Sequence, residues 1–397
     1  VETQRMKRHA NGPTRRRHGP GSIVRVAVLA LVVAAVSAGC ARAPIRIGFA
    51  GPLTGTGSDL GVQGRNGATL AVEELNAAGG ILGHPVTLVP RDDRGDAARA
   101  RELAVEFADL GVAAVVGHMT STASAAIAPL ATELGLVYLS PTASTAALSG
   151  IDDGFFRIQG ATDRPAAALG RHAAEHASVR RVAVIADATN AAYADPYAAA
   201  FAAGLEEAGA RVVYTHRLNV ERLLSWGLDL IAMRERDVDA VLIVASAIET
   251  ARFAQAVRAA GYDWQLYGSG WAATDALHSY GGQAVEGMLF ARSVSVPLGA
   301  SESGRRFVEV YRARFGREPS FAVAQGYDTV RYLATAIQRA GTDAGPLRRA
   351  LVDTGPFETM LGSVEMDRYG DIATGTAVVR STGGTFTTIH DMPRGRL

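Results

Sequence analysis

The residues best suited to chemistry in this sequence are hydroxyl side chains in two neighbouring loops. Thr120, Ser121 and Thr122 follow one short apolar stretch, and Thr142 and Ser144 follow the next. A hydroxyl at a helix start lies beside unpaired backbone N–H groups and the positive end of the helix dipole, which suits a small anion such as a carboxylate. Serine also commonly caps helices. For the pair of serines in adjacent loops, we favour anion binding over capping alone.

The pattern around these hydroxyls predicts a strand, a helix and a second strand. Residues 112–116 (VAAVV) and 136–140 (LVYLS) are apolar runs of strand length. Between them, apolar residues recur at the three- and four-residue spacing of an amphipathic helix that stops at Gly135. In an open parallel sheet, loops at the carboxyl ends of strands line the ligand crevice. We therefore expect both hydroxyl loops to face one crevice.

The same alternation of strands and helices runs from Ile45 through most of the chain, with a second set beginning near residue 162. Such alternation predicts an α/β fold in which parallel sheets carry helices on both faces. We therefore expect two doubly wound parallel-sheet lobes with a ligand cleft between them. In one helix of the second set, the spacing predicts a buried face formed by Leu224, Leu228 and Ile231.

Residues 1–40 are typical of an export signal. An arginine-rich lead precedes a mostly apolar run over residues 23–36, which is too short for a membrane span. The run ends in Ser-Ala-Gly-Cys40, and small residues before a cysteine resemble the lipobox of bacterial lipoproteins. We expect an exported protein, either periplasmic or tethered by lipid on Cys40 to the outer face of the cytoplasmic membrane.

Composition excludes several classes of function. Removing residues 1–40 takes away seven of the 40 Lys+Arg and one of the 39 Asp+Glu, which leaves 33 basic against 38 acidic residues. This balance predicts no nucleic-acid partner. Lys7 is the only lysine, so the mature chain cannot form a Schiff base or use a P-loop lysine. We expect no cofactor.

Two motifs could indicate other chemistry. Gly55, Gly57 and Gly61 lie between a strand and a helix, but their spacing is one residue too long for a dinucleotide fingerprint. His172 and His176 belong to an H-x-x-E-H pattern, which binds zinc in some metalloproteases. No cysteine and histidine cluster elsewhere supports a metal site, and no acid–base pair of an enzyme is visible. We expect neither a metal nor an enzyme.

Longer stretches occur in an order and spacing that match a known family: IRIGFAGPLTG, GATLAVEELNAAGGILG, VVGHMTSTAS, LSPTAS, VRAAGYDWQLYG, AVEGMLFA and AQGYDTVRYLATAI. They resemble the type I periplasmic binding proteins, specifically the branched-chain amino-acid binding branch of ABC importers. The resemblance implies a monomer that delivers a small solute to a membrane permease. It also implies two lobes joined by three crossovers. The lobes are residues 45–161 with 294–375, and residues 162–293 with 376–397.

The resemblance also assigns candidate ligand-binding residues. The family's carboxylate subsite falls on the Ser121 hydroxyl, the Thr142 backbone amide and Ser144. Tyr193 matches an aromatic residue that lines the second lobe. Leu60 stands where the family has a tyrosine facing the ligand side chain.

Ammonium recognition departs from the family pattern. Ser246 replaces a tyrosine that helps to hold the ligand ammonium, and Gly270 replaces the acid that neutralises it. Trp271, beside the missing acid, is suited to stacking on an aromatic or amide ligand, and core packing is the alternative. By default the resemblance implies a branched-chain amino acid, and the ammonium would then need one of three other acids: Asp187, Glu249 or Asp275. Otherwise the ligand lacks an ammonium, as in an importer or a sensor for an aromatic or short aliphatic acid, amide or urea.

Overall fold

Two mainly parallel sheets organise the chain, which confirms the predicted α/β class. The computed structural model describes residues 42–55, 57–176, 179–218, 226–293 and 297–392. The predicted export signal, with Cys40, lies outside the described residues, as does Leu224.

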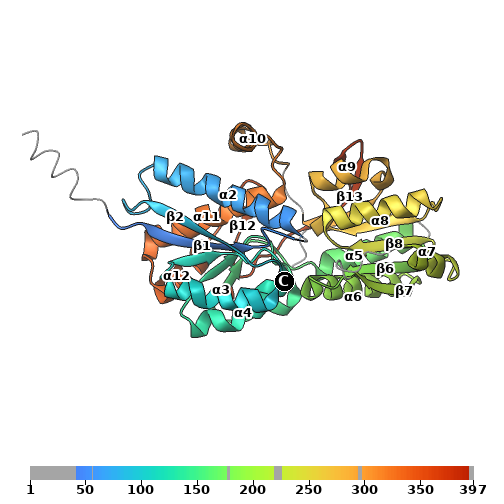
Figure 1. The fold of residues 1–397 in the computed structure, drawn as a ribbon, viewed down its shortest axis with the longest axis horizontal. Coiled ribbons are helices and arrows are strands. Elements are labelled where there is room, and N and C mark those ends of the chain that lie inside the picture. Colours follow the sequence, from blue (N-terminus) through green and yellow to red (C-terminus); the bar gives the residue numbers. More distant parts are fainter. Residues whose placement is uncertain (1–41, 56, 177–178, 219–225, 294–296, 393–397) are drawn as a thin grey trace, which may run out of the picture. The chain divides into compact units, whose positions relative to one another are not determined.

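The first sheet has the strand order β2-β1-β3-β4-β5, and all of its paired strands are parallel. Its strands are β1 (Ile45–Gly51), β2 (Val86–Asp92), β3 (Ala114–Val116), β4 (Tyr138–Ser140) and β5 (Phe155–Arg157). The helices near it are α2 (Ser58–Ala77), α3 (Ala97–Asp109), α4 (Ser121–Glu133), α10 (Glu302–Phe315), α11 (Phe321–Ala340) and α12 (Ala344–Val352). In Figure 1, α2 and α11 lie on one face of this sheet, and α3 and α4 lie on the other.

The second sheet has the order β14-β13-β10-β9-β8-β6-β7, and its strands are parallel except at β13. Its strands are β6 (Arg181–Asp187), β7 (Arg211–Leu218), β8 (Ala240–Val244), β9 (Gln265–Ser269), β10 (Leu289–Ser293), β13 (Thr376–Thr382) and β14 (Thr385–Met392). Its helices are α5 (Asp163–His176), α6 (Ala191–Glu207), α7 (Gly227–Arg234), α8 (Ala247–Ala259) and α9 (Asp275–Gly281). The short strands β11 (Phe357–Thr359) and β12 (Gly362–Val364) form a separate hairpin.

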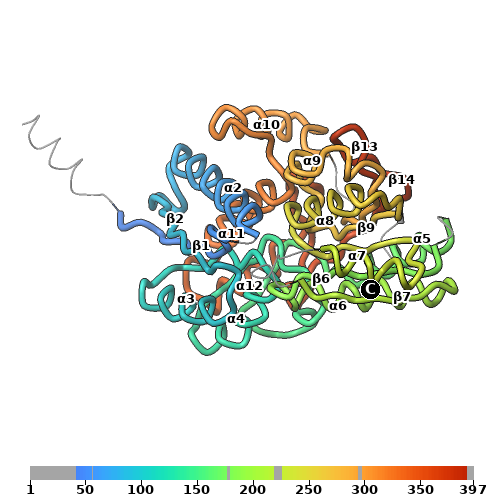
Figure 2. The backbone as a smooth tube through the Cα atoms, turned by 45° about the vertical axis from the view of Figure 1, so that its right-hand side comes forward, coloured from blue at the N-terminus to red at the C-terminus, as the bar shows by residue number. Residues whose placement is uncertain are grey.

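The chain passes between the two sheets three times. It leaves the first sheet after β5, returns after β10, and enters the second sheet again before β13. In Figure 2, the orange α11 accordingly lies among blue and green elements, whereas the red β13 and β14 lie among yellow ones. The exact boundaries of the two lobes stay a prediction, because Pro44–Leu397 form one compact unit.

The predicted buried face of α7 is wrong. Leu228 is 77% exposed and Ile231 is 53% exposed, whereas Leu230 and Met233 are buried. Trp226, Leu230 and Met233 have the same spacing of four and three residues as the predicted set, and all three pack in the core of the second sheet. Two apolar stripes of the same spacing lie on this stretch, and the one that faces the core is the one that contains the large apolar side chain of Trp226.

Close helix packing explains part of the glycine content. A Cβ atom added at Gly67 in α2 would lie 2.0 Å from the carbonyl oxygen of Val323 in α11, and one at Gly326 would lie 2.2 Å from that of Gly64. Gly61, in the glycine pattern considered for a dinucleotide, is needed for packing too. A Cβ atom there would lie 2.0 Å from the Pro52 carbonyl oxygen.

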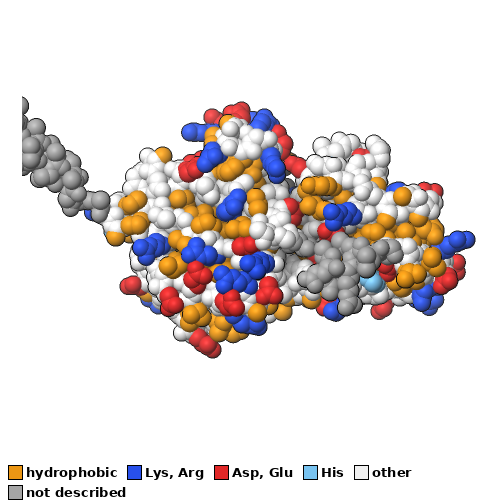
Figure 3. Space-filling model, viewed as in Figure 1, with side chains coloured by type: hydrophobic (Ala, Val, Ile, Leu, Met, Phe, Trp, Pro, Cys, Tyr) orange, Lys and Arg blue, Asp and Glu red, His pale blue; other side chains and the backbone are white. Residues whose placement is uncertain are grey.

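The surface carries charges of both signs. Figure 3 shows basic and acidic side chains interspersed over the face in view. Within the part of the chain that the structure describes, no helix combines the length and apolar character needed to cross a membrane.

Candidate functional site

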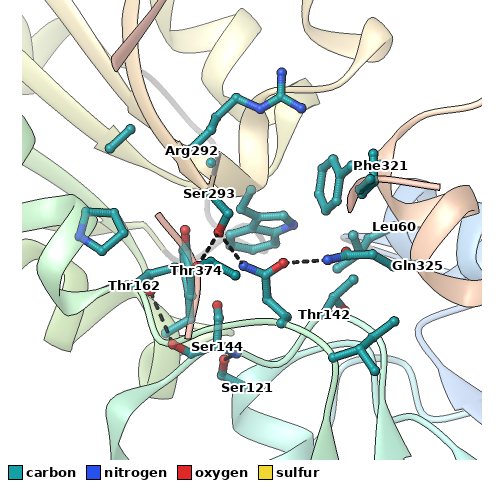
Figure 4. Close-up of a pocket in the computed structure, with 18 of the residues that line it drawn as sticks. Leu60, Ser121, Thr142, Ser144, Thr162, Arg292, Ser293, Phe321, Gln325 and Thr374 are labelled. Atoms are coloured by element: carbon teal, nitrogen blue, oxygen red, sulfur yellow. Dashed lines mark hydrogen bonds between the residues drawn. The ribbon is translucent and has the colours of Figure 1, made fainter. Parts of the chain in front are cut away.

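A cavity of about 320 Å³ is lined by residues from the loops and helices of the first sheet, from β10 and the loops of the second sheet, and from the passages between the two sheets. Six of the seven predicted ligand-binding residues line it: Leu60, Ser121, Thr142, Ser144, Tyr193 and Trp271. The close-up in Figure 4 shows Ser121 and Ser144 beside each other at one end of the cavity.

The seventh residue, Ser246, is absent from the described lining of this cavity. Ser246 is buried at the N-cap of α8, where its hydroxyl oxygen accepts a hydrogen bond from the Glu249 amide at 3.3 Å. Its side chain is thus used to cap a helix, so we leave it out of the proposed site.

The two serines of the hydroxyl loops do not cap helices, because the neighbouring threonines do. Thr120 caps α4 by accepting from the Ala123 amide, and Thr145 caps the short helix that follows it. Ser121 is the first residue of α4, and its hydroxyl oxygen accepts the Ser144 backbone N–H at 3.2 Å. This contact joins the two loops at the positive end of α4, where a ligand carboxylate would be stabilised.

Thr142 can offer a carboxylate its backbone N–H. Its hydroxyl donates to the Met119 carbonyl oxygen, so the hydroxyl proton is already used. Below this loop, Ser124 and Ser140 both donate to the His118 carbonyl oxygen, at 3.1 and 2.7 Å. The Ser140 bond joins the two hydroxyl loops, whereas the Ser124 bond lies within the first of them.

The Asp93–His118 pair lies beneath the same loops and was not identified from the sequence. The two side chains are fully buried, and His118 Nδ1 lies 2.6 Å from Asp93 Oδ2. No local pattern in the sequence joins Asp93 to a histidine 25 residues later.

An aromatic wall forms another part of the cavity. Tyr193 at the start of α6 and Trp271 after β9 meet edge to face, with ring centroids 5.8 Å apart. Burial raises the pKa of Tyr193 to about 12, so this side chain stays neutral. The indole Nε1–H of Trp271 is buried and has no hydrogen-bond partner among the described residues. It is therefore a donor that a ligand can use.

The described lining of the cavity includes no aspartate or glutamate. Asp187 and Glu249 are buried and absent from this lining, and burial raises the pKa of both carboxyl groups. Asp275 lines a neighbouring cavity of about 250 Å³. Arg292 is the one charged residue in the described lining of the main cavity, and Figure 4 shows its guanidinium pointing away from Ser121. The cavity thus offers hydroxyl and amide donors to a carboxylate but no anion to an ammonium.

The histidines of the H-x-x-E-H pattern lie on α5, outside the lining of this cavity. The rings of His172 and His176 stack with centroids 4.5 Å apart, and His390 lies 6.1 Å from each. Across the described residues, no group of three His, Cys, Asp or Glu side chains is arranged to hold a metal ion.

This histidine cluster predicts a loss of stability in acid. Burial, with His176, His390 and Arg380 nearby, lowers the pKa of His172 below its ordinary value of 6.5. A base with a lowered pKa in the folded state stabilises the fold above its unfolded pKa, and this contribution is lost as the pH falls. We expect the free energy of unfolding, measured in urea, to fall between about pH 7 and pH 5. His172→Gln should make this fall smaller, and equal slopes in both proteins would contradict the assignment.

Two mainly parallel sheets, joined by three passages of the chain, carry a cavity large enough for a small solute. Residues 44–384 match the periplasmic binding protein family, so the chain belongs to that family, which is a family of binding proteins and not of enzymes.

Two relatives and one more distant structure illustrate the likeness. The chain is 29% identical to an amino acid binding protein of Pseudomonas aeruginosa, over 90% of this chain and 96% of that one. A leucine binding protein from Thermotoga maritima superimposes with a TM-score of 0.77 at 26% identity, over 88% of this chain and 98% of that one. A solute binding protein from R. palustris, in complex with benzoate, has a TM-score of 0.79 at 18% identity, over 89% and 97% of the two chains.

Proposed function

We propose that this protein is the exported solute-binding component of an ABC importer and captures a small carboxylate-bearing solute by closure of two lobes. Membership of the periplasmic binding protein family supports the binding role. The observation that carries the ligand class is the pair of loops joined by Ser121 and Ser144 at the start of α4. A carboxylate there would accept from hydroxyls and from the Thr142 amide, and charge-assisted bonds of this kind contribute about 1.5–3 kcal/mol each.

Within this class, we favour an aromatic or short aliphatic acid over a branched-chain amino acid. The described cavity lining has no carboxylate to pair with an ammonium, and a buried charge without a partner is strongly unfavourable. The edge-to-face pair of Tyr193 and Trp271 suits a flat ligand. Relatives of known structure include both a leucine binding protein and a benzoate complex, so either ligand class fits this fold.

A thermal-shift screen of the mature domain tests this proposal. The probes are leucine, valine, benzoate, 4-methylpentanoate and the amides of these acids. A ligand at about 100 times its Kd adds about 2.7 kcal/mol of stability. We expect benzoate or 4-methylpentanoate to raise the Tm. The matching amides should leave it unchanged. A shift with leucine or valine alone would reverse the order of the two ligand classes, and shifts with amides but not acids would refute the carboxylate site.

The remaining proposals concern the partners of the mature chain. We propose a monomer that delivers its ligand to an ABC permease and is tethered through lipid on Cys40. Mass spectrometry of the protein purified from membranes would detect the lipid on this cysteine.

A further inference from the structure

Four polar side chains form a chain of hydrogen bonds along one wall of the cavity. Thr374 donates to the Ser293 hydroxyl oxygen at 3.2 Å, and the amide nitrogen of Gln159 donates to the same oxygen at 2.9 Å. The amide nitrogen of Gln325, in α11, donates to Gln159 Oε1. All four residues line the cavity, and Figure 4 shows the chain ending at Gln325.

Each passage of the polypeptide between the two sheets contributes one residue to this series of hydrogen bonds. Gln159 follows β5, Ser293 ends β10, and Thr374 precedes β13. Gln325 joins them from the first sheet's helix α11. Its side-chain position is therefore set by the segments that connect the two lobes.

A backbone carbonyl next to Gln159 determines which atom of the Gln325 side-chain amide has no hydrogen-bond partner in this series. The Gln159 side-chain nitrogen also donates to the Gly160 carbonyl oxygen at 3.4 Å. A carbonyl oxygen can only accept, so the NH₂ group of Gln159 must lie on that side and its Oε1 must face Gln325. Gln325 then presents its own NH₂ group to Gln159. The atom that remains unused at the end of the chain is Gln325 Oε1, an acceptor.

This acceptor is buried without a partner. Gln325 is 7% exposed, and its Oε1 has no hydrogen-bond partner within the described part of the chain. A buried carbonyl left unsatisfied is costly, and such groups are nearly always paired in folded proteins. Because Gln325 lines the solute cavity, a bound solute is the natural source of the missing donor.

We infer that Gln325 Oε1 accepts a hydrogen bond from the bound solute, which therefore carries a hydroxyl group in addition to its carboxylate. This inference rests on the proposed function and narrows its ligand class to hydroxy acids. A hydroxyl is preferred to an ammonium, because Gln325 is neutral and the described lining of the cavity has no carboxylate. A buried cation would be left without a counter-charge.

Titration calorimetry with matched acids tests the inference. The probes are benzoate, its three monohydroxy isomers and the corresponding methoxy compounds, in which the oxygen stays and the donor is lost. We expect at least one hydroxybenzoate to bind the wild-type protein about ten times more tightly than benzoate. Its methoxy counterpart should lose this gain. Because this comparison uses the wild-type protein, it does not depend on any variant folding.

Two variants then test whether the affinity gained from the ligand hydroxyl depends on the Gln325 side chain. Gln325→Met removes the acceptor at similar size, and Gln338→Met changes an exposed residue of the same helix as the matched control. The hydroxyl gain, taken in each protein as the ratio of the hydroxybenzoate affinity to the benzoate affinity, should disappear in Gln325→Met and persist in Gln338→Met.

The outcomes separate this inference from the proposed function. If benzoate binds but no hydroxyl isomer gains affinity over both benzoate and its methoxy analogue, the inference is overturned and the carboxylate site stands. A gain that survives in Gln325→Met also overturns it. If none of these aromatic acids binds the wild-type protein, the aromatic part of the proposed ligand class fails, and the same comparison of 4-methylpentanoate with its hydroxylated and methoxylated analogues decides the inference.

Discussion

Ser121→Ala should weaken binding of the solute acid about tenfold to a hundredfold. The Ser121 hydroxyl lies at the start of α4, lines the cavity and joins the two hydroxyl loops through the Ser144 amide. Its loss removes one charge-assisted hydrogen bond to the carboxylate, worth about 1.5–3 kcal/mol, and each 1.4 kcal/mol is about tenfold in Kd. Titration calorimetry with the acid that gives the largest thermal shift measures the change directly.

The matched control for this prediction is Ser124→Ala. Ser124 is also buried in α4, but its hydroxyl donates to the His118 carbonyl oxygen and it is not part of the cavity's described lining. Its loss should lower the stability of the fold and leave the affinity of the folded protein nearly unchanged. Equal affinities for the wild-type protein and Ser121→Ala would exclude Ser121 as an anion-binding residue.

Gly326→Val should lower the free energy of unfolding by about 3 kcal/mol or more. A Cβ atom at this position would lie 2.2 Å from the Gly64 carbonyl oxygen, so α11 and α2 would have to separate. Overpacking of a tight core costs about 1–3 kcal/mol and occasionally more, and here the obstacle is backbone, which cannot rotate away. Urea unfolding followed by circular dichroism measures the loss.

Gly345→Val serves as the control for the packing argument. Gly345 lies in α12, and a Cβ atom there would meet no atom within 4 Å. Both substitutions place a β-branched residue in a helix, but only the one at position 326 lies against the backbone of another helix. If the two variants lose equal stability, close contact between α2 and α11 is not what requires glycine at position 326.

Much of the fold followed from local pattern, because strand and helix periodicities are properties of short stretches. The hydroxyl loops could be placed at one crevice since the carboxyl ends of neighbouring parallel strands meet at one edge of a sheet. β3 and β4 are indeed paired in parallel, and Ser121 and Ser144 lie within hydrogen-bond distance. The sequence did not show that threonines, and not the two serines, cap the helices, because Ser and Thr are both suited to capping.

The wall of the cavity formed by Gln159, Ser293, Thr374 and Gln325 could not have been found in this way. Gln159 contacts Ser293 across 134 residues of sequence and Gln325 across 166. Three of these residues lie in or beside the passages between the sheets, where no periodicity applies, and the helical pattern of α11 does not indicate which residues Gln325 contacts. Ser246 is a different case, because its predicted role in ligand binding came from resemblance alone. Its side chain caps α8, and its contact with a ligand stays a prediction.

A crystal structure of the mature domain grown with the best acid from the screen tests the central proposal most directly. The account predicts the ligand carboxylate within hydrogen-bond distance of the Ser121 and Ser144 hydroxyls and the Thr142 amide, with the body of the ligand against Tyr193 and Trp271. A carboxylate bound elsewhere in the cavity, or a ligand whose uncharged end lies at the start of α4, would contradict it.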